Sequence, residues 1–95
     1  MKFLEELGFD PKIIIEFEKE VPQPIKTKII DYQAIVSDNI KYLKEIGIKN
    51  YTDAFINYYD MFLIDSTNFQ EIFEKYDRDD LIDKLQNNLA IIEHL

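Results

Sequence analysis

The sequence has no cysteine, only two glycines, Gly8 and Gly47, and a single histidine, His94. Without cysteine there is no disulfide, no thiolate metal ligand and no cysteine nucleophile. Two isolated glycines cannot form the glycine-rich loop that holds phosphate groups in nucleotide-binding proteins. These absences exclude several common kinds of catalytic and cofactor site.

The chain also lacks a long hydrophobic run. No apolar stretch approaches the ~20 residues that a membrane-spanning helix needs. Met1–Leu7 is already polar at Lys2, Glu5 and Glu6, so this segment lacks the apolar stretch that a signal peptide requires. We therefore expect a cytoplasmic protein with no membrane partner.

Positive charge is scarce. The chain has 11 Lys and Arg against 19 Asp and Glu, which gives a formal net charge of −8. Most of the excess lies in residues 51–95, which contain three basic residues and ten acids. Since nucleic-acid affinity rests largely on Lys and Arg that neutralise phosphates, this balance argues against nucleic acid as a partner. It is compatible with docking on a basic partner, and also with solubility alone.

Apolar residues recur at helical spacing nearly throughout, and no segment alternates with a period of two. After Gly8, Asp10 can cap a helix that begins with Pro11 and ends before Pro22 and Pro24. The sequence predicts an all-α protein with one domain over residues 1–95. We expect a compact bundle or a short solenoid of five to seven helices.

One apolar stripe continues from Pro24 without slipping, and it predicts a long helix over about 24–46. Ser37 is the natural place for a bend. The stripe consists of Ile25, Ile29, Tyr32, Val36, Ile40, Leu43 and Ile46.

Another helix, capped by Asn50, is predicted from Tyr51 to about Ile64. Its polar residues are confined to a narrow stripe, and a helix that is apolar around most of its circumference is normally buried on several sides. It is either the central helix of the domain or one wall of an oligomer interface. The candidate interface residues are Tyr51, Phe55, Tyr58, Tyr59 and Phe62.

Two further helices follow. The segment from Thr67 to Gln70 has the form of a capping box. Asp77 can cap the last helix, where Asp79 and Asp80 complement the helix dipole. The same acidic run lacks the glycine and the alternating oxygen ligands of a calcium loop, so we expect no metal site there.

The two glycines occupy equivalent places in FLEELGFDP (3–11) and YLKEIGIKN (42–50). In each stretch, glycine can supply a left-handed residue that ends a helix, and the next residue, Phe9 or Ile48, can fold back on the last turn. Pro22 and Met61 follow the two glycines at the same distance. A duplicated helical unit over 4–22 and 43–61 is predicted.

The shared pattern resembles the repeat of the mTERF family of mitochondrial transcription termination factors, over about two units. The resemblance implies a solenoid of short helical repeats and binding of nucleic acid along a basic groove. This chain departs from the family at Met61, which replaces the second proline, and in its acidic balance. The matching positions are Leu4, Leu7, Gly8, Phe9 and Pro22, then Leu43, Ile46, Gly47 and Ile48.

No constellation of residues predicts catalysis. The Ser and Thr hydroxyls lie outside any glycine-framed turn, and His94 is the only histidine that could serve as a base. The glutamates lack the Glu-x-x-His motif of carboxylate metal sites in helical bundles. We predict a non-enzymatic protein without cofactor, metal or small-molecule substrate. The hydroxyl residues are Thr27, Ser37, Thr52, Ser66 and Thr67.

A candidate phosphate-contacting face comes from the lysines of the long helix. Lys26 and Lys44 point the same way on a helical wheel, and Lys41 lies about 60° round from them. The alternative is a set of solvated lysines whose stems cover apolar surface.

Three functions therefore remain open. The first is a small acidic protein–protein interaction module, self-associating through residues 51–64 or binding another protein. The second is an mTERF-like nucleic-acid-binding repeat that uses lysines of the first half. The third is an acidic inhibitor that mimics nucleic acid.

Overall fold

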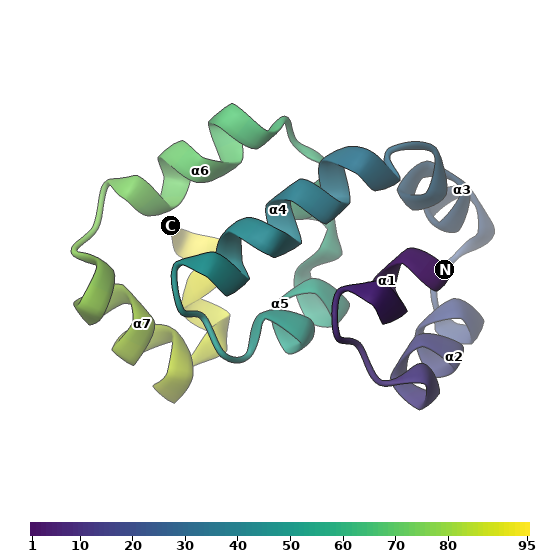
Figure 1. Cartoon of the computed structure of the whole chain (residues 1–95), viewed down its shortest axis with the longest axis horizontal. Helices are drawn as coiled ribbons and strands as arrows, with labels where there is room; N and C mark the ends of the chain where they lie inside the picture. Colours follow the sequence, from purple (N-terminus) through teal and green to yellow (C-terminus); the bar gives the residue numbers. More distant parts are fainter.

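The fold is built from helices alone. The computed structural model describes residues 1–95 and is 79% helical with no strand, which confirms the predicted all-α class. None of the helices is long and apolar enough to cross a membrane. In chain order the elements are α1 (Lys2–Glu6), α2 (Pro11–Glu20), α3 (Gln23–Asp31), α4 (Gln33–Glu45), α5 (Tyr51–Tyr58), the 3-10 helix η1 (Tyr59–Leu63), α6 (Ser66–Glu74), α7 (Arg78–Asn87) and the 3-10 helix η2 (Leu89–His94) (Figure 1).

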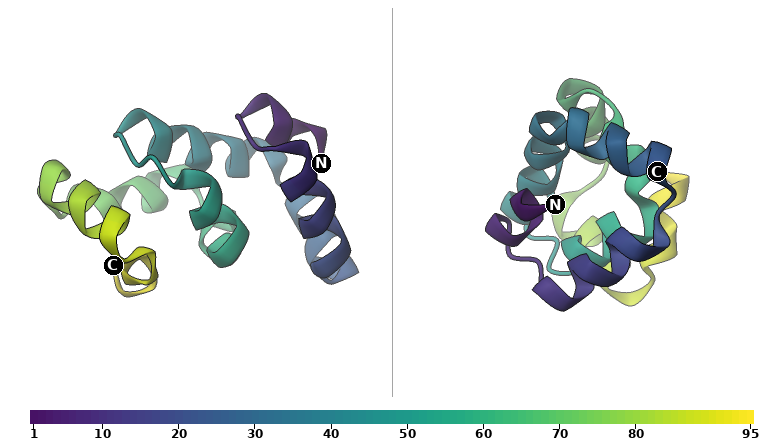
Figure 2. Two further views of the ribbon diagram at one scale, coloured as in Figure 1. Left: turned by 90° about the horizontal axis from the view of Figure 1, so that it is seen from below. Right: turned by 90° about the vertical axis from the view of Figure 1, so that its right-hand side faces the viewer.

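Helix α4 is the centre of the arrangement. It packs against α1, α3, α5, η1 and α6, and it crosses the middle of the molecule in Figure 1. Seen from below in Figure 2, α2 and α3 form one end of the elongated molecule, and α7 with η2 forms the other. The principal extents are 36 × 25 × 22 Å. Because α4 is the central helix, the segment 51–64 is not the central helix of the domain but packs beside it.

A continuous chain of aromatic rings runs through the hydrophobic core. The ring centroids of Phe9 and Phe55 are 5.8 Å apart, and those of Phe55 and Phe62 are 5.4 Å apart. Phe69 lies 5.2 Å from Phe62 and 5.0 Å from Phe73. Such tilted and edge-to-face pairs contribute about 0.5–1.5 kcal/mol each beyond area burial. The chain of rings ties the start of α2 to α5, η1 and α6.

Both glycines end their helices as the sequence predicts. Each has φ of +99°, in the left-handed region that favours glycine. The Gly8 and Phe9 amides donate to the carbonyl oxygens of Glu5 and Leu4, each at 3.1 Å. After α4, the Gly47 amide donates to Lys44 at 3.2 Å and the Ile48 amide to Leu43 at 3.0 Å. This is the hydrogen-bond pattern of the Schellman motif, and Phe9 and Ile48 are buried as its apolar contacts.

The helix N-termini agree only in part with expectation. Asp10 accepts a hydrogen bond from the Lys12 amide at 2.8 Å, and Asp77 accepts one from the Asp80 amide at 3.1 Å, so both predicted caps are confirmed. The prediction of a capping box at Thr67 is wrong. Asp65 caps α6 instead, because its side chain accepts a hydrogen bond from the Asn68 amide at 3.0 Å.

The predicted cap at the start of α5 is also wrong. The Asn50 side chain makes no cap hydrogen bond. Its Nδ2 donates instead to the carbonyl oxygen of Leu85 at 3.1 Å. Asn50 therefore joins the beginning of α5 to the last turns of α7, a partner 35 positions away in sequence that local capping rules do not consider.

The continuous helix predicted over 24–46 is two helices. The chain departs from helical geometry at Tyr32, where φ is −104° and ψ is 24°, between α3 and α4. The predicted bend site, Ser37, lies inside α4. Ile29 and Val36 remain fully buried on either side of the break, so the apolar spacing survives it. Because no Gly or Pro marks Tyr32, periodicity alone could not locate the break.

The α-helix predicted from Tyr51 to Ile64 also ends early. Tyr58, with φ of −135° and ψ of 42°, separates α5 from η1. The buried amide of Asn39 on α4 holds the end of this segment, because its Nδ2 donates to the carbonyl oxygens of Phe62 at 3.0 Å and Ile64 at 2.9 Å. This contact joins residues more than twenty positions apart, so the local pattern does not reveal it.

Gly8→Ala should destabilise the protein more than Gly47→Ala. Each change strains a left-handed backbone, at a cost of about 1–2 kcal/mol. A Cβ at Gly8 would also lie 2.6 Å from the Tyr51 hydroxyl, which donates to the Leu7 carbonyl at 2.9 Å, whereas at Gly47 it would meet only the Ile82 Cδ1 at 3.1 Å. We expect about 3 kcal/mol for Gly8→Ala by urea denaturation. In a Tyr51→Phe background the same change should cost less, and an equal cost would contradict this explanation.

Asn39→Leu should lower the free energy of unfolding by about 3 kcal/mol, because it leaves two inward-facing carbonyl groups without a donor. Asn57→Ala is the control, since its Nδ2 donates to the Asp53 carbonyl at the exposed surface at 2.9 Å. Its effect should stay within about 0.5 kcal/mol. Equal effects in urea denaturation would show that Asn39 does not hold the η1 segment.

Candidate functional site

The five candidate interface residues divide between core and surface. Phe55 and Phe62 are 0% exposed and belong to the core, so neither can contact a partner in the folded monomer. Tyr51, Tyr58 and Tyr59 are half-buried. Packing within the domain thus explains part of the apolar circumference of the 51–64 segment, and of the five candidates only the three tyrosines reach the surface.

Tyr51 has an internal role. Its hydroxyl donates to the Leu7 carbonyl at 2.9 Å and so supports the end of α1. The Lys44 Nζ lies 5.7 Å from the centroid of the Tyr51 ring, within the range of a cation–π contact. Tyr51 therefore joins three elements and leaves little free surface for a partner.

Tyr58 and Tyr59 lie beside a cavity of about 450 Å³ between η1, α6 and η2. We call it the tyrosine pocket. Its lining is mainly apolar, and Ile72 of α6 and Ile92 of η2 contribute to it. Asp60 and Glu93 are its only charged side chains.

Neither carboxylate of the tyrosine pocket is engaged within the protein. No hydrogen bond or ion pair involves the side chain of Asp60 or Glu93, and both residues are exposed. The chain has one ion pair between side chains, Lys84 Nζ to Asp80 Oδ2 at 3.0 Å on α7. The two carboxylates are therefore available to an external cation.

A second hollow adjoins the tyrosine pocket. It shares Ile72 with the pocket and is lined also by Glu71, Glu74 and Lys75 along α6. Lys75 Nζ lies 3.5 Å from the carbonyl oxygen of Leu95, which lines the pocket, so this lysine stands at the boundary between the two. The pocket and the hollow together form what we call the acidic groove, with Asp60, Glu71, Glu74 and Glu93 as its carboxylates.

Sequence reasoning missed the acidic groove because its walls come from three distant segments, around residues 57–61, 68–75 and 92–95. The break at Tyr58 turns η1 away from the course of α5, so Asp60 is not simply one member of a helical polar stripe. The available signal was the strong acidic excess of residues 51–95 next to paired tyrosines.

The candidate phosphate-contacting lysines lie on two helices and not on one. Lys26 is half-buried near the start of α3, whereas Lys41 and Lys44 are exposed in the last turns of α4. The wheel that aligned them assumed one continuous helix, and the break at Tyr32 invalidates that alignment. Lys44 also lies over the ring of Tyr51.

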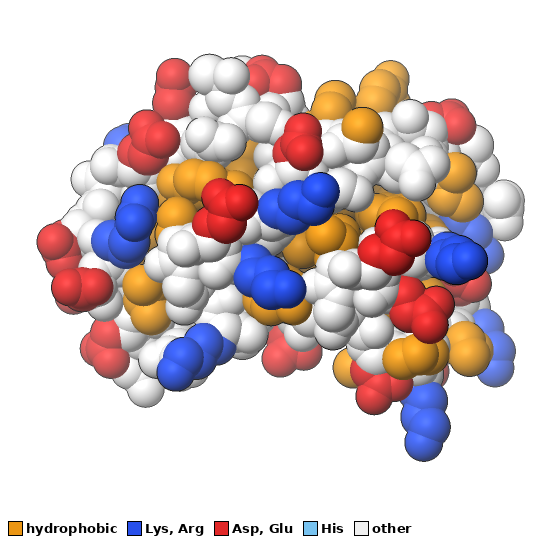
Figure 3. Space-filling model, in the orientation of Figure 1, with side chains coloured by type: hydrophobic (Ala, Val, Ile, Leu, Met, Phe, Trp, Pro, Cys, Tyr) orange, Lys and Arg blue, Asp and Glu red, His pale blue; other side chains and the backbone are white.

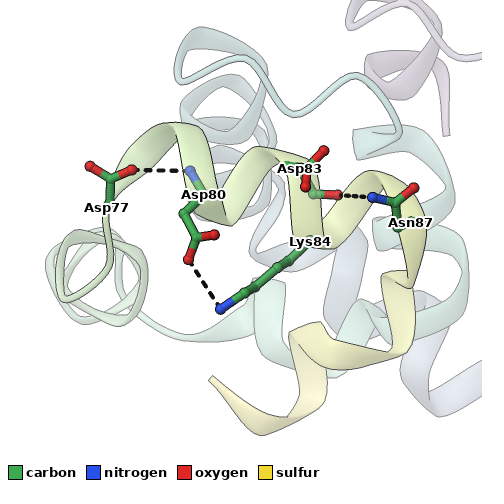
Figure 4. A network of polar contacts seen from close by, with 5 residues as sticks. All are labelled: Asp77, Asp80, Asp83, Lys84 and Asn87. Carbon is green, nitrogen blue, oxygen red and sulfur yellow. Dashed lines mark hydrogen bonds and ion pairs between the residues drawn. The ribbon is translucent and has the colours of Figure 1, made fainter.

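On the face drawn in Figure 3, acidic and basic side chains are interspersed. At the start of α7, Asp77 is a helix cap and Asp80 pairs with Lys84 (Figure 4). No group of three or more His, Cys, Asp or Glu is placed to hold a metal ion.

The residues weighed for catalysis are not hydrogen-bonded to one another. The Thr27 hydroxyl donates to the Gln23 carbonyl within α3 at 3.1 Å. His94 is exposed in η2, and no hydroxyl side chain is hydrogen-bonded to it.

A smaller cavity, of about 320 Å³, lies between α4, α6 and α7 and is lined in part by Tyr42, Phe73 and Arg78. Burial raises the pKa of the Tyr42 phenol, Glu74 raises it further, and Arg78 partly opposes the rise. The neutral phenol is therefore the form that the folded protein favours.

Comparison with known proteins yields no relative. No protein-family model, no curated protein and no solved structure matches this chain. The resemblance to mTERF repeats stays a prediction. The function proposed below is argued from the geometry of the chain itself.

The raised pKa of Tyr42 makes stability fall at alkaline pH. The unfolded phenol loses its proton near pH 10 while the folded one retains it, so this contribution is complete below about pH 10 and is lost above it. Tyr42→Phe should show a shallower loss of stability above about pH 10 in urea denaturation. If the free energy of unfolding fell equally steeply with pH in wild type and in Tyr42→Phe, the raised pKa of Tyr42 would be contradicted.

Proposed function

We propose that this chain is a small, non-enzymatic, acidic helical module that binds a basic segment of a protein partner in the acidic groove. One observation carries the proposal, the tyrosine pocket, whose mainly apolar lining contains the carboxylates of Asp60 and Glu93 and no basic side chain. Pockets that bind ligands combine an apolar lining with a few charged or polar groups in this way.

The charge distribution supports a basic partner. Residues 51–95 carry ten acids and three basic residues and supply the whole groove. Charge complementarity of this kind raises the association rate of an oppositely charged partner and disfavours an acidic one. The acidic groove is therefore suited to a Lys- or Arg-rich segment.

The size of the groove favours a segment over a large globular surface. Two hollows, of about 450 and 610 Å³, share Ile72 in their linings, and the second extends along α6. An extended or helical peptide can place successive side chains in such hollows. Because Phe55 and Phe62 are buried, self-association through the 51–64 segment would have to use its half-buried residues, such as Tyr58 and Tyr59.

The proposal predicts binding of a basic peptide that weakens with salt. A fluorescent peptide of alternating arginine and leucine should bind, a glutamate–leucine peptide should not, and fluorescence anisotropy measures both. Neutralising the four groove carboxylates (D60N, E71Q, E74Q and E93Q together) should weaken binding by about tenfold or more. The matched control neutralises exposed acids of α2 and α4 instead (E16Q, E20Q, D38N and E45Q together).

Both quadruple variants change the net charge equally, so a purely nonspecific attraction would weaken equally in both. That outcome would remove the acidic groove as the binding site. Absence of any binding of the arginine–leucine peptide at low salt would contradict the proposed function as a whole.

A further inference from the structure

We infer that the tyrosine pocket is an anchor site for one arginine side chain of the basic segment, and that it distinguishes arginine from lysine. This inference rests on the proposed function and adds a side-chain specificity to it. The geometric basis is the placement of Tyr58, Tyr59, Asp60 and Glu93 around one cavity.

The lining matches the two parts of an arginine side chain. Arginine has an aliphatic stem that gains from apolar surroundings and a planar, permanently charged guanidinium at its end. Met61 and Ile72, which line the pocket and are half-buried, offer apolar surface to the stem. The carboxylates of Asp60 and Glu93 have no internal partner and can accept hydrogen bonds from the guanidinium.

The two tyrosines favour arginine over lysine. A guanidinium stacks on aromatic faces and is more weakly hydrated than an ammonium, so it loses less on entering a partly apolar cavity. Tyr58 lies at the junction of α5 and η1 and Tyr59 opens η1, which places both on the wall of the pocket. Tyr59 also packs against Phe17, with ring centroids 5.7 Å apart, and this contact restricts its movement before a ligand arrives.

The neighbouring hollow lacks these features. Its lining contains Glu71 and Glu74 but no aromatic residue, and Lys75 contributes a positive charge. That hollow can attract any basic residue through charge alone, without preference for the guanidinium. The two halves of the acidic groove thus differ in chemistry while each contains two carboxylates, which gives the experiment a matched comparison within one protein.

The cavity volume is adequate for an anchor. About 450 Å³ lies within the range of cavities that hold small organic ligands, so it can hold an arginine side chain with room for an adjacent apolar one. An anionic ligand is disfavoured, because the lining has no basic side chain and Lys75 at the boundary already donates to the Leu95 carbonyl.

The test compares an arginine–leucine peptide with a lysine–leucine peptide of identical length and charge. Wild-type protein should bind the arginine peptide about fivefold more tightly, as expected for partly exposed cation–π and bidentate contacts. In D60N/E93Q this preference should fall to about one. In E71Q/E74Q, which removes the same charge from the other hollow, both peptides should weaken and the preference should persist.

The outcomes separate the inference from the function on which it rests. Equal affinity of the two peptides for wild-type protein, or loss of the preference only in E71Q/E74Q, overturns the arginine anchor and leaves the basic-segment function standing. No binding of either peptide overturns both. Circular dichroism of each variant confirms that these exposed substitutions leave the fold intact.

Discussion

The packing of Phe55 against Phe62 is the contact on which the rest of the structure depends. Phe55 also contacts Phe9 and Phe17 from the first part of the chain, and Phe62 contacts Phe69 of α6. Two rings from adjoining segments, α5 and η1, thereby unite helices that have no strand or disulfide to connect them. A domain of 95 residues buries a limited share of its surface, so large aromatic side chains supply much of its stabilisation.

The same arrangement decides which tyrosines reach the surface. Phe55 and Phe62 are buried, whereas Tyr58 and Tyr59, which lie between them in sequence at the break between α5 and η1, are half-buried and line the tyrosine pocket. The lining of the proposed site thus depends on the direction in which η1 continues from α5. The departure from helical geometry at Tyr58 thus affects both the packing of the core and the lining of the acidic groove.

Structural features that depend only on residues close together in the sequence were predicted correctly. The all-α class, the glycine helix ends at Gly8 and Gly47 and the caps at Asp10 and Asp77 follow from local hydrogen bonding and helical spacing. Features that depend on distant partners were not predictable in this way. The break at Tyr32 preserves the apolar spacing, and Asn39 and Asn50 bind carbonyl groups more than twenty positions away. The acidic groove belongs to the second kind, because three separated segments form it.

The hydrogen bond from the Tyr51 hydroxyl to the Leu7 carbonyl has a consequence for how the domain opens. It joins the last turn before α2 to the first turn of α5, across 44 positions of sequence. Local opening of α1 must break this bond and release a ring that also contacts Phe9 and Lys44. We therefore expect α1 and the start of α5 to lose protection from hydrogen exchange together, and not by fraying from the first residue.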